Sequence, residues 1–262
     1  MPKYKIWWQS SIELEGDPLL DEYVKAIKEH SKKILSPDFE IEIRGVKKGT
    51  FSLEYMYFEF LNRNQIINNI IQAEKEGYDG VAIGCFLDPG LHEAREVVDI
   101  PIVGMAETSL FFSCMYGRKF SIVTYVPPYT RKRYPQMISA YGLESRAAPM
   151  GKMNVAFESL TQAFKNPGPV IDAFLKAAKE VVDQGAEVIL SGCGLMNIVL
   201  AKNGVSEVKG TGVPILDTTG TLMKVAEAAI ILNKVNGLKV SRMGYYEKPS
   251  NVSEVRKIYG LE

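Results

Sequence analysis

Histidine and cysteine are both scarce in this chain of 262 residues, which contains two histidines and three cysteines. The histidines, His30 and His92, lie far apart in the sequence. A histidine-rich metal site is therefore not expected, and we expect no cofactor and both histidines at the surface. An odd number of cysteines in a chain of this length does not indicate a disulfide framework. A reducing, cytoplasmic setting is expected instead.

An excess of charge is also missing, because 31 Lys+Arg balance 31 Asp+Glu to a formal net charge of +0. Nucleic acids and anionic membrane surfaces attract basic proteins, so neither is expected as a partner. No apolar run approaches the roughly 18 residues of a membrane-spanning helix. Residues 1–11 lack the apolar stretch and the cleavage site of a signal peptide. The expected partner is a small molecule.

Short β-branched and aromatic runs alternate with longer segments of helical periodicity along most of the chain. The pattern predicts strands at 4–8, 39–46, 80–84, 102–105, 119–124, 187–190 and 213–216, and helices at 19–35, 64–76, 89–98, 108–116, 130–141, 170–184 and 222–236. This alternation is typical of parallel sheets joined by right-handed crossovers. We predict an α/β fold, with either one large domain or two closely docked lobes.

An internal repeat is more informative than the order of elements. Residues 76–85 (EGYDGVAIGC) match residues 184–193 (QGAEVILSGC) without a gap, and 100–103 (IPIV) correspond to 213–216 (VPIL). In each copy a helix ends at a glycine, a strand follows, and Gly-Cys stands at the carboxyl end of that strand. Ligands bind outside the carboxyl ends of strands in open α/β sheets. Two facing lobes would therefore bring Cys85 and Cys193 to one cleft.

A single cysteine after an apolar strand is usually a small buried hydrophobic residue. Two cysteines in register within a repeat favour a functional pair instead. Cys114 has no counterpart in the other copy and is expected in the core.

A facing pair of thiols is suited to inverting a stereocentre. A thiol at the start of a helix feels the positive end of the helix dipole, which lowers its pKa from about 8.5. One thiolate removes a proton from a carbon and a thiol on the opposite side returns one, with no cofactor. The backbone N–H groups of Phe86 and Gly194 are candidate donors to the developing oxyanion.

The two cysteine motifs resemble those of the aspartate/glutamate/hydantoin racemase superfamily, and most closely its hydantoin and allantoin racemase branch. The resemblance rests on 84–90 (GCFLDPG) with 98–104 (VDIPIVG), on 191–194 (SGCG), on 49–54 (GTFSLE) and on the C-terminal residues 237–249. It implies that Cys85 and Cys193 are the two acid/base residues of a cofactor-independent racemase, which forms a homo-oligomer.

The resemblance also implies two pseudo-symmetric flavodoxin-like lobes with parallel sheets and an active site in the cleft between them. We expect residues 1–116 with 217–262 to form the lobe that carries Cys85. Residues 117–216 are expected to form the lobe that carries Cys193.

The first strand departs from the branch, because it ends in Trp7-Trp8-Gln9-Ser10-Ser11 where hydantoin racemases have Asn-Pro-Asn-Thr. The paired tryptophans indicate either a reshaped pocket or simple strand burial. Thr124-Tyr125 is either a substrate-binding strand end or an ordinary turn. The candidate substrate-binding residues are Gln9, Ser10, Ser11, Phe86, Thr124, Tyr125 and Gly194.

A second departure is the aromatic segment that contains Tyr55, Tyr57, Phe58 and Phe60. It indicates either a larger or aromatic substrate, or a helix in the core or at a subunit contact.

The favoured function is a racemase or epimerase for a small carbonyl compound with an acidic α-hydrogen, such as a hydantoin or an amino-acid derivative. A same-fold isomerase, lyase or decarboxylase that uses one cysteine stays open. Two other classes are a thiol-redox protein with a Cys85–Cys193 disulfide and a small-molecule binding protein without catalysis.

Overall fold

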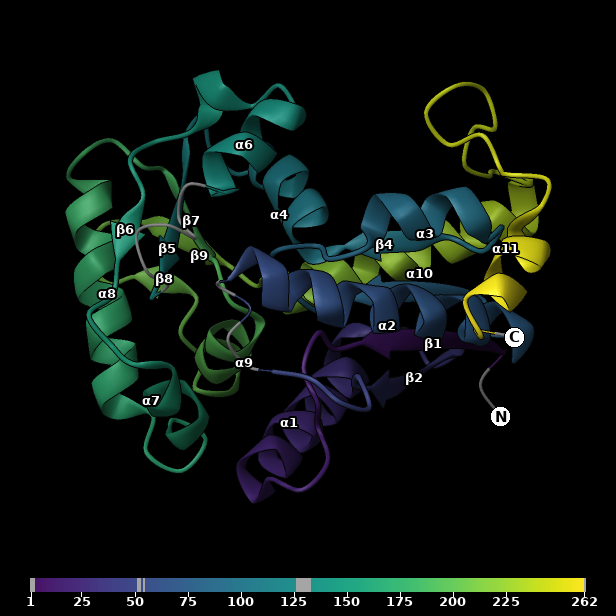
Figure 1. The fold of residues 1–262 in the computed structure, drawn as a ribbon. Coiled ribbons are helices and arrows are strands. Elements are labelled where there is room, and N and C mark those ends of the chain that lie inside the picture. Colours follow the sequence, from purple (N-terminus) through teal and green to yellow (C-terminus); the bar gives the residue numbers. More distant parts are fainter. Residues whose placement is uncertain (1–2, 51–52, 54, 126–132, 262) are drawn as a thin grey trace.

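The computed structural model describes residues 3–50, 53, 55–125 and 133–261. Two separate sheets lie in two halves of the molecule, which Figure 1 shows on its right and left sides. The first half contains β1 (Tyr4–Gln9), α1 (Pro18–Ile34), β2 (Phe39–Arg44), α2 (Met56–Lys75), β3 (Gly80–Ile83), α3 (Leu91–Val97), β4 (Ile102–Gly104) and α4 (Met105–Ser113).

The second sheet and its helices follow in the chain. They are β5 (Phe120–Thr124), α6 (Arg133–Ala140), the 3₁₀ helix η1 (Glu144–Arg146), β6 (Gly151–Lys152), α7 (Phe157–Gln162), α8 (Gly168–Val182), β7 (Val188–Ser191), α9 (Gly194–Lys202), β8 (Glu207–Val208) and β9 (Val213–Leu216). The chain then returns to the first sheet with α10 (Thr218–Asn236), which packs against α4 and β3, and ends with α11 (Val252–Ile258).

The strand order is β2-β1-β3-β4 in the first sheet and β6-β5-β7-β9-β8 in the second. Every pairing is parallel except that of the short strand β8 with β9. The α/β class with parallel sheets predicted from the alternating pattern is thus confirmed. In each sheet the strand that precedes a cysteine, β3 or β7, is flanked on both sides, so its carboxyl end lies centrally at the sheet edge.

Helix boundaries follow local capping chemistry. The Asp17 carboxylate accepts the N–H of Leu19 (2.9 Å), and Pro18 occupies the first helical position of α1. Asp217 caps α10 in the same way by accepting the N–H of Gly220 (2.8 Å). The helices α1 and α10 therefore begin one and four residues earlier than their periodicity predicts.

Three helices were not predicted from periodicity, namely α7, α9 and α11, and α2 begins eight residues earlier than expected. Helix α9 was not predicted because it is buried on almost all sides, so its sequence has no polar face that would indicate a period of 3.6. Its first residue follows Cys193 directly, which matters for the site described below.

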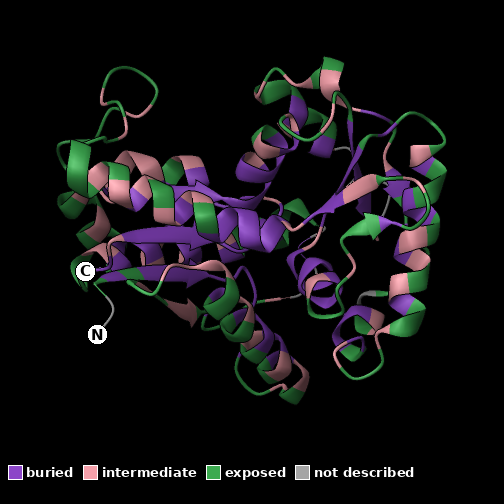
Figure 2. Cartoon of the chain, turned by 180° about the vertical axis from the view of Figure 1, so that it is seen from behind, coloured by how far each residue is buried: buried purple, intermediate pink, exposed green. Residues whose placement is uncertain are grey.

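One continuous apolar cluster joins the two halves. It contains Ile6, Trp8 and Ala82 from the first sheet together with Ile122, Leu190 and Leu216 from the second. Figure 2 shows most strand residues as buried and most exposed residues on the outer helices and loops, although the edge strand β2 is only partly buried. The two halves are therefore closely docked. Lobe limits at 116/117 and 216/217 stay a prediction.

None of the helices in the described part of the chain has the length and apolar composition needed to cross a lipid bilayer.

Candidate active site

The two cysteines follow strands that pair in the same register within their sheets. In the first sheet Gln9 of β1 pairs with Ile83 of β3, and in the second Val123 of β5 pairs with Ser191 of β7. The next N–H after β3 and after β7 donates to the neighbouring strand: Gly84 to the Gln9 carbonyl (2.8 Å) and Gly192 to the Val123 carbonyl (2.9 Å). Counting on two residues from each pair places Ser11 opposite Cys85 and Tyr125 opposite Cys193.

The internal repeat seen in the sequence is also a repeat of conformation. Gly77 and Gly185 end their helices with φ of 80° and 96°, in the left-handed region that glycine adopts without strain. The acids that follow them bind the start of the neighbouring strand. Asp79 accepts the N–H of Lys5 (2.8 Å), and Glu187 accepts the N–H of Arg118 (2.6 Å). Both copies therefore deliver a Gly-Cys pair to the same place in their sheets.

The structure brings the ends of β3 and β7 together. A methyl group added at Gly194 would lie 3.0 Å from the carbonyl oxygen of Gly84, so the two Gly-Cys turns meet directly. Cys85 and Cys193 keep partial exposure, whereas the residues on both sides of each cysteine are buried. Both thiols are free. Each cysteine is thus partly accessible between two buried neighbours.

The Cys85 thiol lies in a turn and does not begin a helix, because α3 starts only at Leu91. Burial raises the pKa of this thiol to about 11. The Ser11 hydroxyl and the N–H of Leu87 oppose this rise, whereas the charge of Asp88 adds to it. The expectation that a helix dipole lowers the pKa of Cys85 is therefore wrong: no helix starts there, and loss of solvation dominates.

Cys193 is the N-cap residue of α9, so the expectation of a thiol at a helix start is correct for this cysteine. Burial nevertheless raises the pKa of its thiol. The N–H groups of Met196 and Leu195 and the Tyr125 hydroxyl act in the opposite direction, since all three stabilise the thiolate. Each cysteine thus has a hydroxyl neighbour from the strand end beside it.

Ser10 and Gln9 are both buried at the end of β1, but their polar groups are engaged locally. The Gln9 amide accepts the indole N–H of Trp7 (2.9 Å) and donates to the Ser10 carbonyl (2.7 Å). The Ser10 hydroxyl accepts the N–H of Ile12 (3.4 Å). Of the first-strand candidates, Ser11 is therefore the one whose hydroxyl faces a cysteine.

The paired tryptophans are buried in the fold on opposite faces of β1. Trp7 meets the ring of Tyr78 edge-on at 5.0 Å. Trp8 is fully buried, and its indole lies so close to Gly84 that a methyl group there would come within 2.4 Å. Strand burial, one of the two interpretations drawn from the sequence, thus accounts for both residues, and Trp8 also supports the Cys85 turn from behind.

The remaining candidates surround the meeting point of the turns. Phe86 is buried with its ring 5.9 Å from that of Tyr134. Burial raises the pKa of Tyr134. A hydrogen bond between the Tyr134 hydroxyl and the buried side chain of Thr124 opposes this rise. Within the described residues, the backbone N–H groups of Phe86 and Gly194 have no acceptor.

Two tyrosines near both cysteines were not identified from the sequence. Tyr23 of α1 and Tyr134 of α6 are almost fully buried, and the charges of Cys85 and Cys193 contribute to the raised pKa of each phenol. The Tyr134 hydroxyl donates to the Gly192 carbonyl (3.0 Å). Both occupy apolar helix positions typical of core residues, so the sequence carries no signal that separates them from packing.

Several other expectations need correction. Cys114 is half-buried at the C-cap of α4 and not in the core. The histidines are also half-buried: His30 contacts Asp217 (2.6 Å), and Nδ1 of His92 contacts the Tyr246 hydroxyl (2.7 Å). The aromatic side chains of α2 and the residue before it are exposed, which excludes the core interpretation. Residues 51, 52 and 54 of the segment 49–54 lie outside the described residues.

In the part of the chain that the structure describes, no group of three or more His, Cys, Asp or Glu side chains is arranged to hold a metal ion. The functional groups gathered at the strand ends are thiols, hydroxyls and backbone N–H groups. Such a set can exchange protons with a bound molecule and stabilise an oxyanion.

Comparison with known proteins points to one family. A family model described as Asp/Glu/Hydantoin racemase matches residues 21–226. A hydantoin racemase from Pseudomonas sp. (strain NS671) is 34% identical over 231 residues, which cover 86% of this chain and 86% of that protein.

Solved structures show the same fold. An allantoin racemase from Klebsiella pneumoniae superposes with a TM-score of 0.79 at 23% identity and covers 94% of both chains. Unliganded arylmalonate decarboxylase superposes with a TM-score of 0.59 at 16% identity, over 87% of this chain and 92% of that one. The fold implied by the cysteine motifs is thereby confirmed.

Proposed function

Because the chain belongs to the Asp/Glu/hydantoin racemase family and is an isomerase of the racemase type, we propose that Cys85 and Cys193 are its two acid/base residues. They invert a stereocentre that carries an acidic C–H bond next to a carbonyl group. The observation that carries this proposal is the meeting of two equivalent Gly-Cys turns, in which each cysteine keeps partial exposure between two buried neighbours.

The reaction needs one thiolate and one thiol on opposite sides of the substrate carbon. The thiolate removes the α-proton, and the electron pair of the C–H bond moves onto the adjacent carbonyl to give an enolate. The opposite thiol then donates its proton to the other face of the carbon and becomes the thiolate. The protein ends with its proton on the other cysteine, and the reverse reaction uses the two groups in exchanged roles.

The enolate oxygen needs hydrogen-bond donors in the same site. The N–H groups of Phe86 and Gly194 are suitable, because each directly follows a cysteine and has no acceptor within the described residues. Donors fixed in the backbone are already oriented before reaction, which is why they stabilise developing charge effectively. This set of groups supports a reaction without a metal or an organic cofactor.

Hydantoins and related cyclic amides are the proposed substrate class, since their α-hydrogen is activated by a carbonyl group and the similar proteins include a hydantoin racemase. The relatives' names also cover allantoin, and enantiopure samples of both should be compared by polarimetry. Turnover of free amino acids with neither cyclic amide accepted would contradict this substrate class.

Replacement of each cysteine tests the mechanism. Cys85→Ser and Cys193→Ser should each lower racemisation by at least about 100-fold, the range of a lost general acid or base. Cys114→Ser is the matched control and should keep the parent rate, because Cys114 lies at the end of α4. Racemisation at the parent rate in both active-site variants would rule out the two-cysteine mechanism.

Isotope exchange separates this proposal from a same-fold lyase or decarboxylase. In deuterated water, each inversion by two separate groups should leave one solvent deuterium on the product α-carbon. Inversion without deuterium in the product, or loss of a substrate group, would point to a different reaction of the same site.

A further inference from the structure

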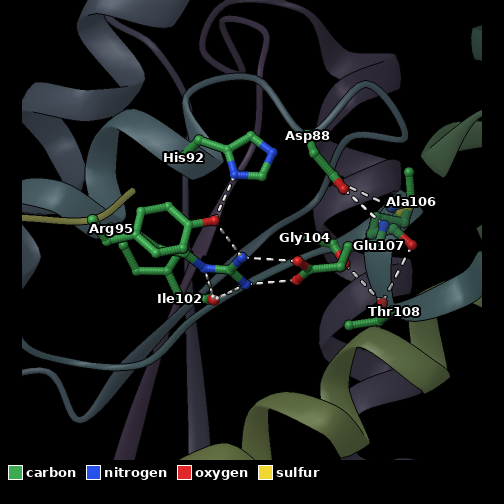
Figure 3. A network of polar contacts seen from close by, with 10 residues as sticks. Asp88, His92, Arg95, Ile102, Gly104, Ala106, Glu107 and Thr108 are labelled. Carbon is green, nitrogen blue, oxygen red and sulfur yellow. Dashed lines mark hydrogen bonds and ion pairs between the residues drawn. The ribbon is translucent and has the colours of Figure 1, made fainter. Parts of the chain in front are cut away.

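A polar network surrounds the start of α4, and Asp88, which stands three residues after Cys85 in the chain, belongs to it (Figure 3). The Asp88 carboxylate is buried and accepts the backbone N–H groups of Ala106 (2.9 Å) and Glu107 (2.8 Å). These amides belong to the first turn of α4, whose N-cap residue, Gly104, has no side chain with which to cap them. Asp88 therefore caps α4 from a different part of the chain.

The backbone of Asp88 is tied to the turn that carries Cys85. Its N–H donates to the Cys85 carbonyl (3.0 Å), and its φ of 45° lies in the left-handed region that non-glycine residues rarely adopt. The space for its carboxyl group exists because residue 104 is glycine: a methyl group there would lie 2.4 Å from Cγ of Asp88. The position of the carboxylate on α4 thus holds the turn in this conformation.

Charged groups surround Asp88 on the neighbouring elements. On α4, Glu107 binds Arg95 of α3 through two contacts (2.8 and 2.6 Å), and Arg95 also donates to the Ile102 carbonyl (2.8 Å). Tyr141 lies within electrostatic reach of Asp88. The groove of about 340 Å³ that Asp88 borders is lined by further ionisable side chains, namely Arg63, His92, Glu93, Glu96, Arg133 and Tyr245.

These surroundings both raise and lower the pKa of the Asp88 carboxyl group. Burial raises the pKa of its carboxyl to about 7, and the charge of Glu107 adds to the rise. The two N–H groups of α4 and the charge of Arg95 oppose it. Above neutral pH Asp88 is therefore a carboxylate, and it remains one throughout the range in which the Cys85 thiol ionises.

We propose that Asp88 is a positioning residue for Cys85: it fixes the turn that carries the thiol, and it places a negative charge near Cys85 that its counterpart in the repeat, Met196, does not place near Cys193. Resting on the proposed two-cysteine function, this makes Cys85 the acid and Cys193 the base of the resting enzyme. A negative charge close to a thiol disfavours the thiolate, because like charges repel in a poorly solvated site.

The two copies of the repeat differ in the residue that follows each cysteine at the third position. Asp88 stands three residues after Cys85, and the corresponding residue three positions after Cys193 is Met196. Met196 contributes only its backbone N–H, which stabilises the Cys193 thiolate. One copy thus places a carboxylate, and the other the amide end of α9, beside its cysteine.

Alkylation of the full-length protein by iodoacetamide, followed by mass spectrometry of the two cysteine peptides, tests the proposal. The alkylation rate of each thiol, measured from about pH 6 to 12, gives the pH at which it ionises. In the parent protein, Cys193 should ionise at lower pH than Cys85. In Asp88→Asn, the midpoint of Cys85 should fall by about one pH unit, a tenfold gain in thiolate at fixed pH below the midpoint. The midpoint of Cys193 should stay unchanged.

Glu93→Gln is the matched control, because it removes a carboxylate from α3 that lines the same groove and pairs with Arg63 (3.1 Å). It should move neither midpoint. An unchanged Cys85 midpoint in Asp88→Asn, or an equal shift in Glu93→Gln, overturns the proposal. If Asp88→Asn does not fold, the parent protein decides, since ionisation of Cys85 at or below the midpoint of Cys193 also overturns it.

This measurement does not depend on turnover. A shifted Cys85 midpoint in a protein that racemises nothing would support the role of Asp88 and refute the proposed function. Racemisation by a protein whose Cys85 midpoint does not shift in Asp88→Asn would support the proposed function and refute the role of Asp88.

Discussion

Cys85 and Cys193 hold corresponding places in the chain but meet different neighbours. Ser11 and the N–H of Leu87 stabilise a thiolate at Cys85, whereas Tyr125 and two N–H groups of α9 do so at Cys193. Burial outweighs these contributions at both sites, so the pKa of each thiol lies above its ordinary value. A proton-transfer pair of this kind works best in alkaline solution.

The pH dependence of activity follows from these directions. The reaction needs one thiolate and one thiol, so kcat/KM should rise with pH as the first thiol ionises, above its ordinary pKa, and should fall once the second thiol has lost its proton as well. Initial rates measured by polarimetry from pH 6 to 11.5 check this, with enzyme incubated at each pH and assayed at pH 9 as a stability control. A profile that is already flat between pH 6 and 8 would contradict the raised pKa values.

At the scale of elements, α4 and the Cys85 turn depend on one another. Helix α4 begins at a glycine and takes its cap from Asp88, and Asp88 in turn finds its place because α4 starts where it does. The same helix packs extensively on α10, so the turn is anchored to the body of the first half. The active-site loop is therefore held by a helix that contributes no side chain to the chemistry.

Substitution of Gly104 should break this arrangement. In Gly104→Ala the added methyl group would collide with the Asp88 carboxyl, displace it from α4, and lower the free energy of unfolding by about 1–2 kcal/mol, the usual loss for a removed helix cap. Urea denaturation measures the effect.

Gly168→Ala is the matched control for that experiment. Gly168 begins α8 and has open space around it, so alanine there should leave stability unchanged or slightly increase it. Equal stability of the Gly104→Ala variant and the parent protein would show that the Asp88 cap does not stabilise α4.

On the scale of the whole molecule, buried charges supplement the shared apolar cluster in joining the two halves. Glu59 of α2 is buried and binds Arg63 of the same helix through two contacts (3.0 and 2.6 Å). It also meets Arg133 of α6 at 3.5 Å, which connects the two halves beside the site. Within the first half, His30 of α1 contacts Asp217 at the start of α10 (2.6 Å).

Neutralising Glu59, which contacts both arginines, should lower the free energy of unfolding more than removing Arg133 alone. Glu59→Gln removes the carboxylate that Arg133 contacts and leaves Arg63 with its contact to Glu93 (3.1 Å), so we expect a loss of about 2–4 kcal/mol in the free energy of unfolding. Arg133→Met should cost only about 1 kcal/mol, because Glu59 keeps both contacts to Arg63. Urea denaturation measures the free energy of unfolding of both variants. A smaller loss in Glu59→Gln than in Arg133→Met would contradict this prediction.

Lys179→Met is the control for those variants. It removes an ion pair to Asp183 on the exposed side of α8, and stability should change by no more than about 0.5 kcal/mol.

Much of the fold was predictable because its signals are local. Alternating apolar runs located most strands and helices, and left-handed glycines such as Gly77 and Gly185 ended helices where the repeat places them. Helix α9 was not predictable by this route, since burial on all sides removes the periodic contrast between apolar and polar residues. Self-association and the lobe limits stay predictions.

By itself, the sequence determined the α/β class, the repeat and the pairing of Cys85 with Cys193, because all three depend on residue order and spacing along one chain. Only the tertiary structure decided how the two thiols differ. Their solvation, the start of α9 at Cys193 and the carboxylate of Asp88 behind Cys85 arise from packing between distant segments. Residues such as Tyr23 and Tyr134 likewise reach the site only through folding, since their helix positions have the same pattern as ordinary core residues.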